Sequence, residues 1–128
     1  MFVLVDTVSI RDDKNEAAAM KDLFESELVA AGENDWKIAI GHFPCHSAGH
    51  YSGISSTRYE IEPILNEQNV DFYLSGHDHN LQHWTTRGNP SAPDHIVTGT
   101  FWQLGVYKRV LNVVSFSRSW RSECLWEI

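Results

Sequence analysis

The apolar positions of the first forty residues form two runs, separated by one amphipathic segment. Residues 2–8, FVLVDTV, are mostly apolar and β-branched and predict a buried strand, and RDDKN predicts a polar turn after it. Asp13 followed by Glu16 matches the spacing of a capping box, which predicts the start of a helix, and Gly32 predicts its end. The predicted buried face of this helix contains Met20, Leu23, Phe24, Leu28 and Ala31.

A loop and a second helix are predicted in the middle of the chain. The apolar stretch WKIAIGHFP predicts a second strand, and residues 45–56 predict a loop because they are small and have no period. Thr57 with Glu60 forms a second capping-box pair, which predicts a helix through about Asn69. Pro63 lies inside this helix and should remove one backbone hydrogen bond and kink it.

Two further strands complete the predicted sheet. VDFYLSG at 70–76 and DHIVTG at 94–99 are short apolar runs bounded by polar residues and glycine. The order strand, helix, strand, helix, strand predicts βαβ units and a mostly parallel sheet. Ligands in such sheets bind beyond the carboxyl ends of the strands. Beyond residue 100 the pattern weakens, and GVYKRVLNVVSFS could form one or two strands.

Composition narrows the function classes. The chain has 128 residues, enough for one domain, and carries a formal net charge of -7 from 10 basic and 17 acidic residues. This charge argues against nucleic acid and anionic membranes as partners, because both select a basic surface. No apolar run approaches the roughly 18 residues of a membrane span, and the first residues lack a signal-peptide pattern. Two cysteines are too few for a disulfide framework.

The candidate chemistry lies in the histidines. All seven occur between His42 and His95, and two Gly-His pairs follow two predicted strands directly. If these strands are parallel neighbours, the rings of His42, His77 and His79 converge at one edge of the sheet, where neutral imidazoles could bind a metal ion. A polar loop bonded to its own backbone is the alternative, but the repetition at two strand ends favours a metal site.

These stretches resemble a known family. WKIAIGHFPCHSAGH and EPILNEQNVDFYLSGHDHNLQ are similar to the binuclear metallophosphoesterases of the calcineurin-like superfamily, and most to the tartrate-resistant, purple acid phosphatase type. The resemblance implies an α/β fold: the C-terminal half of a four-layer α/β/β/α sandwich with a mostly parallel mixed sheet and flanking helices. It places the C-terminal part of the phosphoesterase domain at 1–99 and a divergent tail at 100–128.

The resemblance also implies an activity and a metal centre. The family hydrolyses phosphate monoesters with a metal-bound hydroxide at a dinuclear centre of iron with iron, zinc or manganese. His42 and His77 match ligands of the divalent ion, and His79 matches a ligand of the ferric ion. Asp78 and Asn80 could orient these ligands or contact the substrate. The family is often secreted or lysosomal.

The loop after GHFP departs from the family pattern. The family has a histidine there that binds phosphate or protonates the leaving group, and this position aligns with Tyr51, a candidate substrate contact. His50 lies one place earlier and is either the catalytic acid or a solvated loop residue. His46, His83 and His95 match no role and are expected at the surface.

The family's carboxylate ligand motifs are absent. The chain has no Gly-Asp pair and no Gly-Asn-His, so three neutral imidazoles would hold at most one zinc-type ion weakly. One apolar sheet face should also be exposed, which predicts either the missing N-terminal half or self-association as a partner. Three readings remain: a phosphatase portion that is weakly active or inactive alone, a non-catalytic zinc-binding or protein-interaction module, and a plain α/β domain with polar strand ends.

Overall fold

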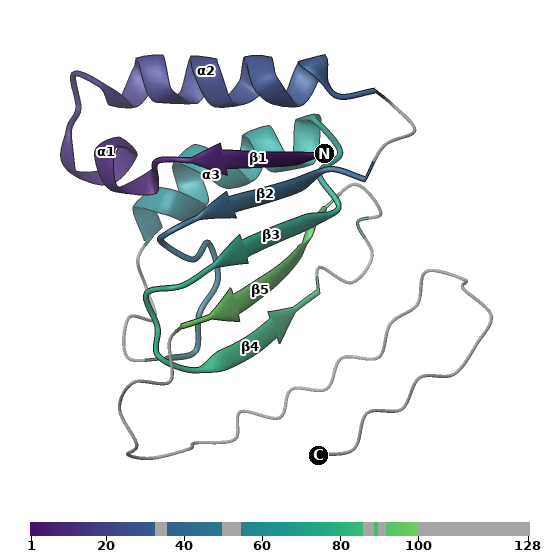
Figure 1. Cartoon of the computed structure of the whole chain (residues 1–128). Coiled ribbons are helices and arrows are strands. Elements are labelled where there is room, and N and C mark those ends of the chain that lie inside the picture. The colour runs from purple at the N-terminus through teal and green to yellow at the C-terminus, as the bar shows by residue number, and fades with distance from the viewer. Residues whose placement is uncertain (33–35, 50–54, 86–88, 90–91, 100–128) are drawn as a thin grey trace.

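The computed structural model describes residues 1–32, 36–49, 55–85, 89 and 92–99. Within them, a five-stranded sheet carries helices on one of its faces (Figure 1). The sheet order is β1-β2-β3-β5-β4, and every neighbouring pair is parallel except β4 with β5. In chain order the elements are β1 (Phe2–Val5), α1 (Thr7–Asp12), α2 (Ala17–Ala30), β2 (Ile38–Gly41), α3 (Ser55–Glu67), β3 (Phe72–Ser75), β4 (Leu81–Trp84) and β5 (Asp94–Thr98).

This arrangement confirms the α/β class and the mostly parallel sheet. The predicted first strand, however, is only half strand: β1 ends at Val5 and α1 begins at Thr7. The cause is Asp6, whose Oδ1 accepts hydrogen bonds from the backbone N–H groups of Val8 at 3.0 Å and Ser9 at 3.1 Å. An aspartate in this position caps a helix and overrides the weak β preference of the residues that follow. The predicted turn RDDKN therefore starts inside α1.

The amphipathic helix α2 forms as predicted, but its buried face is narrower. Phe24 and Leu28 are buried, whereas Leu23 is 54% exposed. Asp13 accepts from the backbone N–H groups of Asn15 and Glu16 and closes the turn before the helix. Glu16 itself is the N-cap and makes no side-chain capping bond, so the predicted capping box does not form.

Helix α3 begins at Ser55, two residues before the predicted cap. Thr57 is consequently a buried residue of the first turn, and Pro63 lies inside the helix with its side chain exposed. Strand β4 was not predicted. It pairs antiparallel with β5, with Leu81 opposite Thr98, and forms one edge of the sheet.

The core lies between the sheet and helices α2 and α3. Its fully buried members are Leu28, Ala39, Ile61, Leu65 and Tyr73. The Tyr73 hydroxyl donates a hydrogen bond of 2.7 Å to the Phe43 carbonyl, so a polar group enters this core with its partner.

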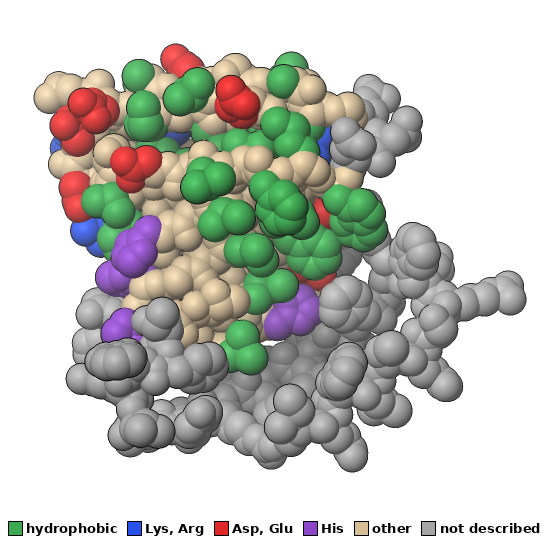
Figure 2. Space-filling view, viewed as in Figure 1, with side chains coloured by type: hydrophobic (Ala, Val, Ile, Leu, Met, Phe, Trp, Pro, Cys, Tyr) green, Lys and Arg blue, Asp and Glu red, His purple; other side chains and the backbone are tan. Residues whose placement is uncertain are grey.

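The opposite face of the sheet is apolar and open (Figure 2). Phe2 is 65% exposed and Leu4 is 78% exposed, because they alternate with the inward residues Val3 and Val5. The strand register continues these two rows with half-buried Ile38, Phe72, Ile40, Leu74 and Ile96. None of the helices and strands described covers this face, in agreement with the exposed apolar face expected from the sequence.

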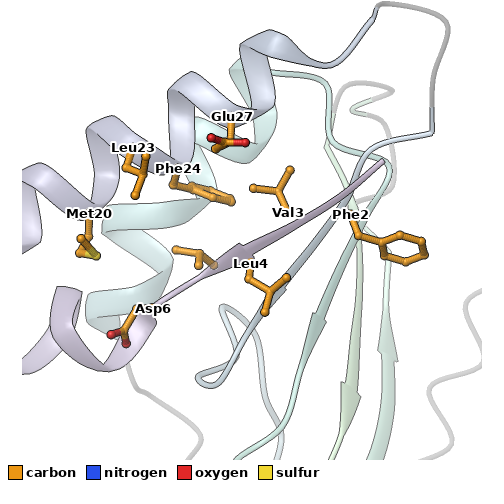
Figure 3. Close-up of a pocket in the computed structure, with 9 residues that line it drawn as sticks. Phe2, Val3, Leu4, Asp6, Met20, Leu23, Phe24 and Glu27 are labelled. Carbon is orange, nitrogen blue, oxygen red and sulfur yellow. The ribbon is translucent and has the colours of Figure 1, made fainter.

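A hollow of about 340 Å³ lies between β1 and α2 (Figure 3). Its walls include Val3, Leu4, Leu23 and Phe24, with Asp6 and Glu27 at its margin. It contains no histidine and lies apart from the candidate chemistry. No helix among the residues described has the length and apolarity to cross a bilayer.

Leucines 23 and 28 provide a test of this packing. Replacing the fully buried Leu28 by alanine should lower the free energy of unfolding by about 2–5 kcal/mol, because a cavity remains in the core. Leu23→Ala, on the same helix but exposed, should cost less than about 1 kcal/mol. Urea unfolding followed by circular dichroism measures both, and equal losses would show that α2 packs with a different face.

Candidate functional site

Two histidines meet where β2 and β3 end. His42 follows β2 directly, and His77 lies two residues after β3. Because these strands are parallel neighbours, their carboxyl ends share one edge, and histidine side chains gather there in Figure 2. Nε2 of His42 lies 3.1 Å from Nδ1 of His77.

The backbone around this pair is held by three hydrogen bonds. The buried Thr7 hydroxyl accepts from the N–H groups of His42 at 3.1 Å and Phe43 at 2.9 Å. The Gly76 N–H donates to the His42 carbonyl at 3.1 Å, which ties the two strand ends together. His77 has a φ of 63°, a left-handed conformation that is uncommon outside glycine and is often found at functional sites.

The surroundings of His77 favour its neutral form. Burial lowers the pKa of His77, and the nearby His42 ring lowers it further. The Phe43 ring packs edge-on against His77, with 4.5 Å between the ring centroids. The Arg11 guanidinium lies over the same Phe43 ring, 3.8 Å from its centroid. A neutral imidazole is the form that binds metal ions.

The pair fits part of the ligand set of one metal ion. Two nitrogens that each lie about 2.0–2.1 Å from a tetrahedral ion are about 3.3 Å apart, close to the 3.1 Å between His42 and His77. The His79 side chain is exposed, and among the residues described no carboxylate joins the pair in a group of three with ligand atoms within 4.8 Å. These residues therefore do not form a complete dinuclear centre by themselves.

Asp78 and Asn80 hold the loop that follows β2. Asp78 is 1% exposed and accepts a hydrogen bond from the Ser47 hydroxyl. The Gln82 side chain of β4 donates to Ser47 at 3.0 Å and to Asn80 at 2.6 Å, and its oxygen accepts from the Ala48 N–H at 2.8 Å. This network fixes the position of residues 47–49 beside the histidine pair.

The same region leaves room only for glycine at two positions. A Cβ at Gly49 would lie 2.6 Å from Cγ of Asp78, and one at Gly99 would overlap the Asp78 carbonyl oxygen. The Gly99 N–H also donates to the Asn80 carbonyl at 3.2 Å. The end of β5 therefore supports the His77–Asn80 segment by direct backbone contact.

A second cluster forms from residues that the sequence did not single out. His46 and His95 were expected at the surface, and this is wrong: His95 is 1% exposed, and the side chains of His46 and Glu62 are each 15% exposed. His95 alternates with Asp94 and Ile96 and faces α3, where Glu62 lies. The alternation of residues in β5 could have predicted that His95 faces inward, but no sequence pattern singled out Glu62.

Burial and contacts set the charges of this cluster. Burial lowers the pKa of His95 to about 4, so its ring is neutral at pH 7. Burial alone would raise the pKa of Glu62, but hydrogen bonds with His46 and Arg58 outweigh it and lower the pKa. Glu62 is therefore an ionised carboxylate beside a neutral imidazole.

The remaining candidates are the other histidines, the cysteines and Tyr51. His50 and Tyr51 lie outside the residues described, as does Cys124. Cys45 is a buried free thiol whose pKa is raised by burial, so it stays protonated. His83 is exposed on β4, as expected, and its Nε2 lies 3.4 Å from Asp94.

Comparisons with known proteins found similar sequences and a similar fold. The family model described as calcineurin-like phosphoesterase matches residues 3–81, more than half of the chain. Purple acid phosphatase 17 of Arabidopsis thaliana is 38% identical over 73 residues, which are 57% of this chain and 21% of that protein. Human tartrate-resistant acid phosphatase type 5 is 34% identical over 55 residues, 43% of this chain and 17% of that protein.

A solved structure is also similar. It is titled GAP50, the anchor in the inner membrane complex of Plasmodium, and it superposes with a TM-score of 0.66 at 29% identity. The match covers 77% of this chain and 31% of that one. The chain thus spans only about a fifth of the length of its curated relatives, with 21% of the plant phosphatase as an example.

Gly76 and Gly99, which both lie beside the His77–Asn80 segment, should differ in how well they tolerate replacement by alanine. Gly99→Ala places a methyl group on the Asp78 backbone and should lower the free energy of unfolding by about 1–3 kcal/mol. At Gly76 the nearest atom to an added Cβ is the His42 carbonyl at 3.9 Å, so Gly76→Ala should change stability by less than about 1 kcal/mol. Thermal melts of both variants measure this, and a harmless Gly99→Ala would contradict the close packing.

Proposed function

This chain belongs to the calcineurin-like phosphoesterase family, and we propose that it supplies the histidine side of a metal centre that hydrolyses phosphate monoesters. The observation that carries the proposal is the 3.1 Å approach of the His42 and His77 ring nitrogens beyond the ends of β2 and β3. The acid phosphatases among its relatives support this reaction class.

Each residue has a defined part in the proposal. His42 and His77 would hold one divalent ion, and His79, exposed at the same edge, would bind a second. Two such ions lower the pKa of a coordinated water and offset the charge that develops on the phosphoryl oxygens. Asp78 and Asn80 act by fixing the neighbouring loop, and His50 is the candidate acid for the leaving group.

Carboxylates must complete this centre, because neutral imidazoles do not offset the repulsion between two cations. We propose that they come from a segment equivalent to the part of the relatives that this chain does not span. The open sheet face around Phe2 and Leu4 is the surface on which that segment would pack. Burying it would bring carboxylates to the edge where the histidines lie.

A non-catalytic module is the second candidate function. Among the residues described, no carboxylate joins the histidine pair in a group of three ligand atoms within 4.8 Å, and the similar Plasmodium structure is titled an anchor. In this case the open apolar face would serve association with another protein, and any metal would stabilise the fold. Hydrolysis would then be absent even when all metal ligands are supplied.

The two candidate functions can be distinguished by joining this chain to the part of Purple acid phosphatase 17 that it does not match. Hydrolysis of an aryl phosphate by the joined protein supports the enzyme, and His42→Ala or His77→Ala should each lower kcat/KM by about 100-fold or more. The control His83→Ala removes an exposed imidazole elsewhere and should leave kcat/KM unchanged. A folded, metal-loaded joined protein without hydrolysis supports the module, and activity that survives His42→Ala and His77→Ala rejects the proposed site.

A further inference from the structure

His46, Glu62 and His95 form a cluster of possible metal ligands on the helix-covered side of the sheet. They come from three elements: the loop after β2, helix α3 and strand β5. Each offers one ligand atom, and the three atoms all lie within 4.8 Å of one another. We propose that this cluster is a second metal site, which binds zinc or a similar divalent transition-metal ion.

The distances are close to those of a zinc site. Nε2 of His46 lies 2.6 Å from Oε1 of Glu62, and Nε2 of His95 lies 3.9 Å from the same oxygen. A tetrahedral zinc ion with bonds of about 2.0–2.2 Å separates its ligand atoms by about 3.3–3.6 Å. Shifts of less than about 1 Å would therefore open the first contact and close the second around one ion.

The burial of His95 points to a ligand. Its side chain is 1% exposed, and neither ring nitrogen has a hydrogen-bond partner among the residues described. Leaving such a group unsatisfied costs about 1–3 kcal/mol, so native proteins rarely do so without a reason. The His95 ring also packs edge-on against Tyr73 at 5.8 Å between centroids, and its Nε2 faces the Glu62 carboxylate at 3.9 Å.

The carboxylate is oriented as a ligand would be. Arg58 donates from Nε to Oε2 of Glu62 at 3.0 Å, which leaves Oε1 directed at the two imidazoles. Such outer contacts fix the geometry of metal ligands in known sites. Two histidines and one carboxylate form a common zinc ligand set, with the fourth position left to water.

An ion here would act on the loop after β2. It would tie His46 of this loop to α3 and β5, and the next residue, Ser47, donates to Asp78 beside the His42–His77 pair. The cluster shares no residue with that pair, so this inference does not depend on the proposed hydrolysis.

Zinc binding by the whole chain tests the proposal, in a His42→Ala/His77→Ala background that removes the imidazole pair at the ends of β2 and β3. We expect one zinc ion per chain by elemental analysis, a zinc-dependent rise in the melting temperature, and the visible absorption of tetrahedral cobalt when Co²⁺ replaces zinc. Glu62→Gln should lower the zinc affinity at least tenfold, since it keeps the size of the side chain and removes its charge. His95→Phe should do the same while preserving ring packing.

A matched control lies on the neighbouring strand. His83→Gln removes an exposed histidine outside the cluster and should leave the zinc affinity within about twofold. Melting without metal establishes that each variant is folded. The proposal is overturned if the background protein binds no zinc, or if folded Glu62→Gln and His95→Phe variants bind zinc as tightly as that background protein does.

Discussion

The parallel pairing of β2 with β3 is the constraint on which the site depends. It sets the carboxyl ends of the two strands side by side, and the hydrogen bond from the Gly76 N–H to the His42 carbonyl extends that pairing past the last strand residues. The rings of His42 and His77 meet because their backbones are already joined. Thr7 at the start of α1 then fixes the turn at His42 from the β1 side, so three elements, α1, β2 and β3, support a single contact.

Local patterns in the sequence predicted most of the fold, and the exceptions have physical causes. The helix α2, the helix α3 and three of the parallel strands follow from apolar period and length. The helix α1 was missed because one capping side chain, Asp6, outweighs the β-branched residues after it. Strand β4 has only four residues, with polar Gln82 facing inward, so its identity depends on pairing with β5 and not on its own pattern.

The candidate site also contains residues that the sequence could predict and residues that it could not. The glycine–histidine pairs could be found because each follows an apolar strand directly, and a parallel sheet brings such ends together. The cluster of His46, Glu62 and His95 could not be found, although the alternation in β5 predicts that His95 faces inward, because a loop, a helix and a strand meet there only after the chain has packed. These three residues lie far apart in the sequence, and their spacing matches no metal-binding motif. Tertiary packing also explains why Leu23 is exposed despite its helical register with Phe24 and Leu28.

The order of the strands in the sheet has a consequence for how the chain assembles. Strands β1, β2 and β3 lie side by side in the order in which they occur along the chain, so each can add to the strand made before it as the polypeptide leaves the ribosome. β4 is made before β5 but pairs only with β5, which lies between it and β3. The antiparallel pair of β4 and β5 therefore joins the rest of the sheet through the β3–β5 ladder, and this junction brings Gly99 and Gln82 against the segment that carries His77.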